Sequence, residues 1–381
     1  MLVLLLLASS AAACTQVGTP QGWSGGKVVG NVLYVGTMAG DLRAIDIDTG
    51  ATMCTFEPES EASSRAFYGS PAVRGETLFV GGYDGMLYAL PLDCDDLWEP
   101  IDQEIVGSGG SIVGSAVIAD DLVLVGSSDG NLYAFEVERE GGGVRLGEKW
   151  RFPTGDRVWS TPAVADGVVY FGSLDHNLYA VGLSDLEPMW PEPFMAQGAI
   201  TAKPVVSGGR VYFGSFDSVF YAIDAQTGRE VWRFDEATNW FWAEAVSSED
   251  TIYAASLDGN LYALDIDTGA LNWKLETGGA ILGSPSIVGE MIATASLHNK
   301  RASLHLVNRL DGSDKKRCTF GNRNSTKIRA SLEVHENVVY LAATDHSIRA
   351  LEVDSLGDPD EKWVHFTDQD VPVDPNREED C

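Results

Sequence analysis

Six aspartates recur at one point of a repeating pattern, and each is followed by glycine, serine or histidine. They are Asp84, Asp129, Asp175, Asp217, Asp258 and Asp345. Carboxylates gathered in a ring could bind calcium, which prefers oxygen ligands. The alternative is structural, because Asp-Gly and Asp-His pairs favour tight turns between strands. We interpret the six as turn residues.

The other motifs with chemical potential are incomplete. Residues 46–50 and 265–269 resemble half of a calcium-binding loop, but each segment lacks a third ligand and a distal glutamate. The sequence has no Ser-His-Asp order and no histidine-rich metal spacing. We therefore predict no catalytic residue, no metal site and no enzymatic activity.

These turns belong to a repeat that predicts the fold. Blocks of the type Leu-Tyr-Ala-Leu recur eight times between Ala44 and Ala350, at steps of 41 to 46 residues. A period in the low forties with four short strands per unit indicates a β-propeller. We predict an all-β, eight-bladed β-propeller of four-stranded antiparallel blades over residues 23–366. Tryptophans follow six of the blocks, as repeat core, at Trp98, Trp150, Trp190, Trp232, Trp273 and Trp363.

The first strand of each blade should line a central channel. Just before it, at equivalent positions, the repeats carry Trp23, Tyr68, Val113, Trp159, Thr201, Phe241, Leu282 and Arg329. Exposed aromatic rings at such a mouth often mark a ligand or peptide groove, and Trp242 flanks this set. The alternative is that the rings pack between blades as core. Two positions further on, Lys203 is the only cation, and it could meet an anionic ligand or pair with Glu244.

The cysteines leave several pairings open. Cys54, Cys94, Cys318 and Cys381 allow three full pairings in an oxidising compartment. Cys54 and Cys318 lie in matching Cys-Thr-Phe contexts, at the place where other repeats have tryptophan. We predict that these two are buried small hydrophobic residues rather than disulfide partners.

Both ends of the chain differ from the repeats. Residues 2–7 are apolar, too few to cross a bilayer, and lead through small residues to Cys14. This segment resembles the lipobox of bacterial lipoproteins, so we predict a signal peptide over 1–13, lipidation of Cys14 and a tether over 14–22. An ordinary secretory signal cut after Ala13 is the alternative, and either one exports the protein. Residues 367–381 are acidic and proline-broken, which predicts a disordered tail.

Charge is distributed unevenly along the chain. The chain has 56 acidic and 26 basic residues and a net charge of −30, which argues against nucleic-acid binding. Residues 300–329 reverse this balance with nine basic and two acidic residues. This segment predicts a contact surface for an acidic partner or anionic lipid headgroups; the alternative is neutralisation by carboxylates of neighbouring blades. The candidate patch is Lys300, Arg301, Lys315, Lys316 and Arg317.

The repeat also carries family motifs. Ser-Pro-Ala-Val at 70–73, Thr-Pro-Ala-Val at 161–164 and Ala-x-Asp-x-x-Thr-Gly-x-x-x-Trp at 222–232 resemble the pyrroloquinoline-quinone (PQQ)-type propeller repeat. Within that family, quinoprotein dehydrogenases hold PQQ and calcium in the central funnel. BamB-type lipoproteins are bare eight-bladed scaffolds that assist the assembly of outer-membrane β-barrels. Length, blade count and the lipobox-like start resemble the second group, and no two cysteines are adjacent, as they often are in the first.

Together these features predict a non-catalytic lipoprotein of the cell envelope, facing the periplasm or the exterior. It should act as a scaffold for envelope protein partners, be attached to the membrane through its lipid, and be a monomer outside its complexes. We predict no cofactor. Two alternatives remain: a PQQ- and calcium-dependent dehydrogenase, and a propeller that binds carbohydrate or peptide through its aromatic residues.

Overall fold

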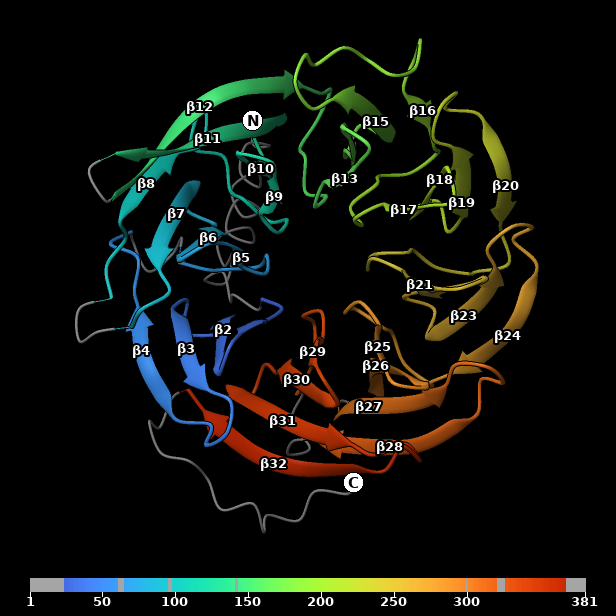
Figure 1. Ribbon diagram of the computed structural model, residues 1–381. Helices are drawn as coiled ribbons and strands as arrows, with labels where there is room; N and C mark the ends of the chain where they lie inside the picture. Colours follow the sequence, from blue (N-terminus) through green and yellow to red (C-terminus); the bar gives the residue numbers. More distant parts are fainter. Residues whose placement is uncertain are drawn as a thin grey trace, which may run out of the picture.

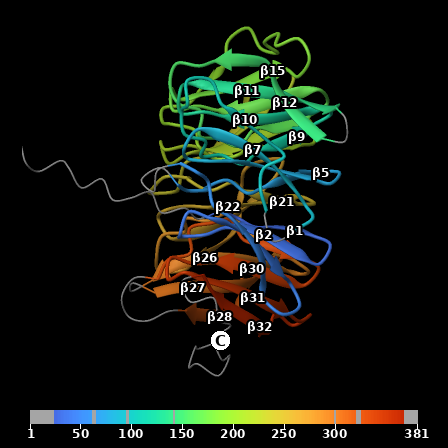
Figure 2. The ribbon, with the colours of Figure 1, turned by 90° about the vertical axis from the view of Figure 1, so that its left-hand side faces the viewer.

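The computed structural model describes residues 24–60, 65–94, 98–140, 143–298, 301–320 and 326–367. Within these residues the chain forms 32 strands and no helix, so no helix there could cross a membrane. The strands make eight four-stranded antiparallel sheets that stand as blades around a central axis (Figure 1), and the side view shows a thick disc (Figure 2). The predicted all-β, eight-bladed propeller is confirmed.

Each blade consists of four consecutive strands, numbered from the channel outward. Blades one to four are β1 (Lys27–Val29), β2 (Val32–Gly36), β3 (Leu42–Asp46), β4 (Thr52–Phe56); β5 (Ala72–Arg74), β6 (Thr77–Gly81), β7 (Met86–Pro91), β8 (Asp102–Ile105); β9 (Val117–Ala119), β10 (Leu122–Gly126), β11 (Asn131–Glu140), β12 (Gly143–Pro153); β13 (Ala163–Ala165), β14 (Val168–Gly172), β15 (Asn177–Gly182) and β16 (Phe194–Met195).

The second half of the ring repeats this plan. Blades five to eight are β17 (Val205–Ser207), β18 (Arg210–Gly214), β19 (Phe220–Asp224), β20 (Glu230–Phe234); β21 (Val246–Ser248), β22 (Thr251–Ala255), β23 (Asn260–Asp265), β24 (Leu271–Glu276); β25 (Ser286–Val288), β26 (Met291–His298), β27 (Arg301–Asn308), β28 (Asp314–Phe320); β29 (Glu333–His335), β30 (Val338–Ala342), β31 (Ser347–Val353) and β32 (Pro359–Phe366).

Tryptophans on or near the outermost strands join neighbouring blades. Trp232 on β20 donates its indole N–H to the carbonyl of Ile266 in the next blade at 3.1 Å, and its ring packs on Gly269. Gly269 has a φ of +71°, and a Cβ there would lie 2.5 Å from the ring, so this turn needs glycine. The same indole hydrogen bond to the next blade is made by Trp150, Trp190, Trp273 and Trp363.

The ring closes by packing between complete blades. All described sheets contain only consecutive strands, so the first and last blades share no strand. Trp363 of blade eight instead donates to the carbonyl of Ile47 in blade one at 2.7 Å. On the channel side, the N–H of Val28 donates to the carboxylate of Glu333 at 3.1 Å, and Lys27 lies 3.8 Å from the same carboxylate.

Blade two departs from the predicted pattern. Its outermost strand is β8, where Asp102 rather than Trp98 lies opposite Ala89. Trp98 donates to the carbonyl of Pro91 in its own blade at 2.8 Å. The contact to blade three is made by Asp102 instead. Its carboxylate accepts a hydrogen bond at 2.6 Å from the N–H of Leu146, which lies on the extended β11–β12 hairpin.

The prediction for Cys54 is wrong, because Cys54 forms a disulfide with Cys94. Cys54 lies opposite Ala44 on β4, at the place of the docking tryptophan, and Cys94 follows β7 of the next blade. The bond therefore joins blades one and two where other blades use an indole ring. Cys318 is buried, as predicted, but it is likewise disulfide-bonded, so the second half of its prediction is also wrong.

Candidate functional site

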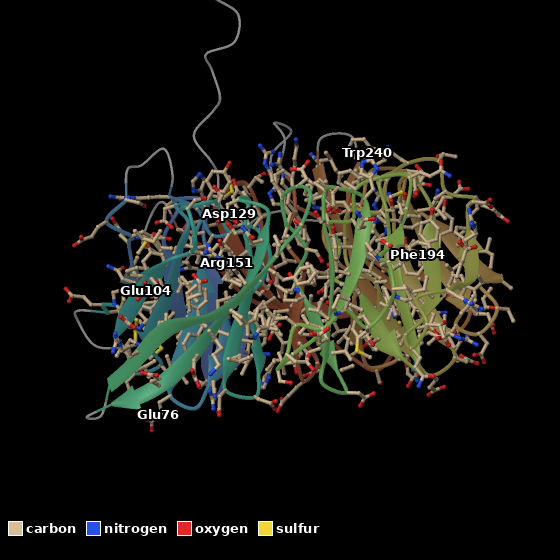
Figure 3. All side chains as sticks on the ribbon, turned by 90° about the horizontal axis from the view of Figure 1, so that it is seen from above. Glu76, Glu104, Asp129, Arg151, Phe194 and Trp240 are labelled. Atoms are coloured by element: carbon tan, nitrogen blue, oxygen red, sulfur yellow. A yellow bond between two sulfur atoms is a disulfide. The ribbon has the colours of Figure 1, made fainter. Side chains whose placement is uncertain are left out.

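The central channel widens into a hollow at each face of the disc. One hollow, of about 330 Å³, lies on the face that carries the turns between second and third strands. We call it the aromatic mouth; its wall includes Tyr68, Tyr83, Val113, Trp159, Trp242, Leu282 and Arg329. The opposite hollow, of about 360 Å³, is lined by residues such as Lys27, Ile118 and Glu333. Trp240 and Glu76 mark the two faces in Figure 3.

The aromatic mouth contains most of the residues predicted for it. Tyr68, Trp159, Lys203, Trp242 and Arg329 all line this hollow, although they come from five different blades. Each reaches it because the segment before a blade's first strand runs along the channel. Trp23 lies outside the described residues.

The placement of Phe241 in this ring is wrong. Phe241 is 1% exposed and packs in the core, 5.5 Å from Phe220 and 6.2 Å from Tyr262 between ring centres. Trp242, the next residue, takes the channel position instead. The equivalents of Phe241 in other blades are also buried and apolar: Phe67, Ile112, Val158, Ile200, Ile281 and Ile328.

An aromatic stack connects the mouth to the rim. Phe216 lies between two indoles, with ring centres 4.5 Å from Trp240 and 5.4 Å from Trp242. Trp240 is 45% exposed and Trp242 lines the hollow, so the stack runs from solvent into the mouth. Trp159 is held in place by its indole N–H, which donates to Ser128 at 2.9 Å. Phe216 and Tyr83 lie in turns between second and third strands, and the alignment of the segments before the first strands therefore missed them.

A belt of hydroxyl groups lies below the aromatic residues. The N–H of Ser70 donates to the hydroxyl of Ser115 at 2.9 Å, and the N–H of Ser115 donates to Thr161 at 2.8 Å. Further round, the N–H of Glu244 donates to Ser284 at 3.2 Å. Each bond joins one blade to the next, which explains why small hydroxyl side chains recur here.

Lys203 and Glu244 interrupt this belt. They occupy the belt positions of blades five and six and line both hollows, so they lie where the two meet. Lys203 is exposed, and within the described part of the chain its amine has no hydrogen bond or ion pair, so it does not pair with Glu244. Burial raises the pKa of Glu244, and the nearby Lys203 opposes this shift only in part.

The turn aspartates are used by the fold itself. One oxygen of Asp258 accepts from the N–H of Asn260 at 2.9 Å. The other accepts from the hydroxyl of Tyr262 at 2.7 Å and from the N–H of Thr238 in the preceding blade at 3.0 Å. The same tyrosine contact recurs for Asp84, Asp129, Asp175 and Asp217.

These contacts also affect the tyrosines. Burial, together with the hydrogen bond to Asp129, raises the pKa of Tyr133 to about 12, so its hydroxyl remains a donor at physiological pH. Among the described residues no three carboxylate, imidazole or thiol side chains gather as a metal site.

The donors in the aromatic mouth do not fit calcium-bound PQQ. Calcium takes about six to eight oxygen ligands, several of them carboxylates, whereas Glu244 is the one carboxylate among the described residues that line this hollow. The absence of a cofactor remains a prediction. We expect calorimetric titration of the folded protein with PQQ and calcium to give no saturable heat; one PQQ bound per chain would contradict it.

The candidate basic patch is partly neutralised. Lys316 lies 3.5 Å from Asp358 of blade eight, as expected if neighbouring carboxylates balance it. The exposed Arg317 donates a hydrogen bond to the hydroxyl of Ser303 at 3.3 Å. Within the described ranges, no ion pair is made by Arg301, Lys315 or Arg317, and Lys300 lies outside them. A role for this surface in binding stays a prediction.

The sequence places this propeller in a known family. Residues 12–146, 145–240 and 217–373 match the PQQ-repeat family described as "Outer membrane protein assembly factor BamB". The chain belongs to this family. No curated protein matches the sequence at a significant level.

Solved structures share the fold of this BamB-family chain. BamB from Moraxella catarrhalis is 18% identical with a TM-score of 0.65, over 84% of this chain and 90% of that one. The computationally designed Ika8 protein is 16% identical with a TM-score of 0.70, over 87% and 96%. Chaetomium thermophilum Sqt1, bound to the N-terminus of the ribosomal protein L10, is 12% identical with a TM-score of 0.68, over 84% and 93%.

Proposed function

We propose that this protein is a non-catalytic propeller of the cell envelope that binds a segment of a partner protein in its aromatic mouth. The observation that carries the proposal is the mouth itself, where Trp159, Trp242 and Tyr68 surround a hollow of about 330 Å³. Pockets that hold ligands are typically concave and aromatic, with a few polar groups that orient the ligand. Arg329 and Lys203 are such groups here.

Two further features support an envelope location. Disulfides persist mainly in oxidising compartments, and the Cys54–Cys94 bond joins two blades. The family description names outer-membrane protein assembly, so we propose that the partner belongs to that process. Attachment through an acylated Cys14 is part of this proposal, and Cys14 and residues 1–13 lie outside the described residues.

Site-specific photo-crosslinking in envelope-bearing cells tests the proposal. A crosslinking residue at Leu282, in the aromatic mouth, should capture one protein, and the same group at Ile118, in the opposite hollow, is the control. Replacing Trp159 and Trp242 with alanine should abolish the product from Leu282. Equal products from both hollows would contradict the site. In the same cells Cys14→Ser should move the protein into the soluble fraction, and its retention in the membrane would contradict the lipid anchor.

A further inference from the structure

Within the described residues, Lys203 makes no hydrogen bond or ion pair to a neighbouring blade. In blades three, four and seven the belt position is a hydroxyl group that accepts a hydrogen bond from the preceding blade, as Thr161 does for Ser115. A lysine amine is a donor only and cannot replace such an acceptor. Its side chain is exposed in the channel and makes no polar contact within the described ranges. The fold therefore leaves this cation available to a ligand.

The charges in the mouth favour a carboxylate over an amine. Lys203 and Arg329 both line the hollow, against Glu244 as the one acidic side chain of its described lining. An incoming ammonium group would be repelled by two cations, whereas a carboxylate would be attracted to both. A carboxylate bound to a lysine in a partly closed site forms a strong, charge-assisted hydrogen bond.

The size of the mouth favours the end of a chain. A volume of about 330 Å³ lies at the small end of the range for ligand pockets, roughly 300–1,000 Å³. A single chain end of a few residues fits such a space, whereas a loop needs room for two segments of polypeptide side by side. Trp159 and Trp242 offer the walls against which a last apolar side chain could pack.

We propose that the aromatic mouth binds the C-terminal end of a partner polypeptide, with the terminal carboxylate at Lys203 and the last apolar side chain between Trp159 and Trp242. This inference rests on the proposed function and adds which part of the partner is recognised. Lys203 distinguishes a chain end from the rest of a polypeptide, because only the end places a free carboxylate at the bottom of the mouth.

Three synthetic peptides test this inference by calorimetry with the folded full chain. The first is an acetylated hexapeptide of glycine and serine that ends in alanine and phenylalanine with a free carboxylate. The second is the same peptide with an amidated end, and the third is amidated but carries an internal glutamate. We expect the free acid to bind at least about ten-fold more tightly than either amide, as the loss of one charged hydrogen bond implies.

Matched lysine variants test whether Lys203 causes the preference for the free acid. Lys203→Gln should weaken binding of the free acid about ten-fold and leave binding of the amide unchanged, whereas Lys203→Arg should keep the preference. Lys149→Gln, on the exposed outer strand β12, should change neither, and thermal unfolding checks that all variants are folded.

The outcomes separate this inference from the proposed function. Equal binding of acid and amide, or full binding by Lys203→Gln, overturns recognition of a terminal carboxylate. If the amidated glutamate peptide binds as tightly as the free acid, the mouth recognises a side-chain carboxylate, and the inference of a terminal carboxylate is again overturned. If no peptide binds while Leu282 still crosslinks to a protein, the inference fails and the protein-binding mouth stands. If Leu282 also captures nothing, both fail.

Discussion

Replacing Trp232 with alanine is expected to destabilise the propeller by about 3–5 kcal/mol, which is typical for loss of a buried tryptophan. Trp232 is 8% exposed, packs on Gly269 and donates a hydrogen bond to the carbonyl of Ile266. The alanine variant leaves a cavity between blades five and six and removes one hydrogen bond to that carbonyl, which still accepts from Arg210 and Tyr212. Guanidinium unfolding followed by far-ultraviolet circular dichroism measures the change.

Trp240 provides the matched control for this experiment. It is the same residue type eight positions away, but it is 45% exposed and its ring contact is to Phe216 at the rim. Trp240→Ala should therefore cost less than about 1.5 kcal/mol, the value of one aromatic pair. Equal destabilisation by the two variants would mean that docking between blades does not govern stability.

The prominent parts of this fold could be predicted because they repeat. A turn aspartate, a buried third strand and a docking tryptophan recur in most blades. A strand that is hard to assign in one blade can therefore be assigned from its equivalents in the others. Docking also has a local signature, since Thr-Gly after a third strand marks the site for the tryptophan of the preceding blade, as at Gly269 and Gly228.

The channel could be predicted less well, because its residues differ from blade to blade. In residues 240–242 three aromatic residues follow one another, and their identity does not say which one faces the channel. The deciding signal is the small residue that follows the ring position, such as Gly69 or Ala202, and it places Trp242 rather than Phe241 in the ring. With that register Glu244 becomes the equivalent of Lys203.

The pairing of Cys54 and Cys94 needed a fact that only the structure supplies. The docking tryptophan of one blade reaches the turn after the third strand of the next, as Trp232 reaches Gly269. Cys54 stands at the docking position of blade one, and Cys94 lies in the corresponding turn of blade two. Their separation of 40 residues is close to one repeat. The matching Cys-Thr-Phe contexts of Cys54 and Cys318 favoured buried thiols instead, because free cysteines are usually buried.

Removing this disulfide is the second change with a large expected effect. The variant Cys54→Ala/Cys94→Ala opens a loop with a sequence separation of 40 residues. Loop-closure entropy for that length gives a loss of about 4 kcal/mol in the free energy of unfolding. Equilibrium guanidinium unfolding of the oxidised protein measures it, with the wild type as reference.

The two single variants decide whether the covalent bond is the cause. A disulfide is lost when either cysteine is removed, so Cys54→Ala and Cys94→Ala should each cost about as much as the double variant. If the effects of the single variants instead add up to that of the double variant, the two side chains contribute by separate packing. The first result would mean that blades one and two are held by a bond that persists mainly in an oxidising compartment, whereas the junction between blades eight and one uses the indole of Trp363. An oxidising compartment would then be a condition for the full stability of the propeller.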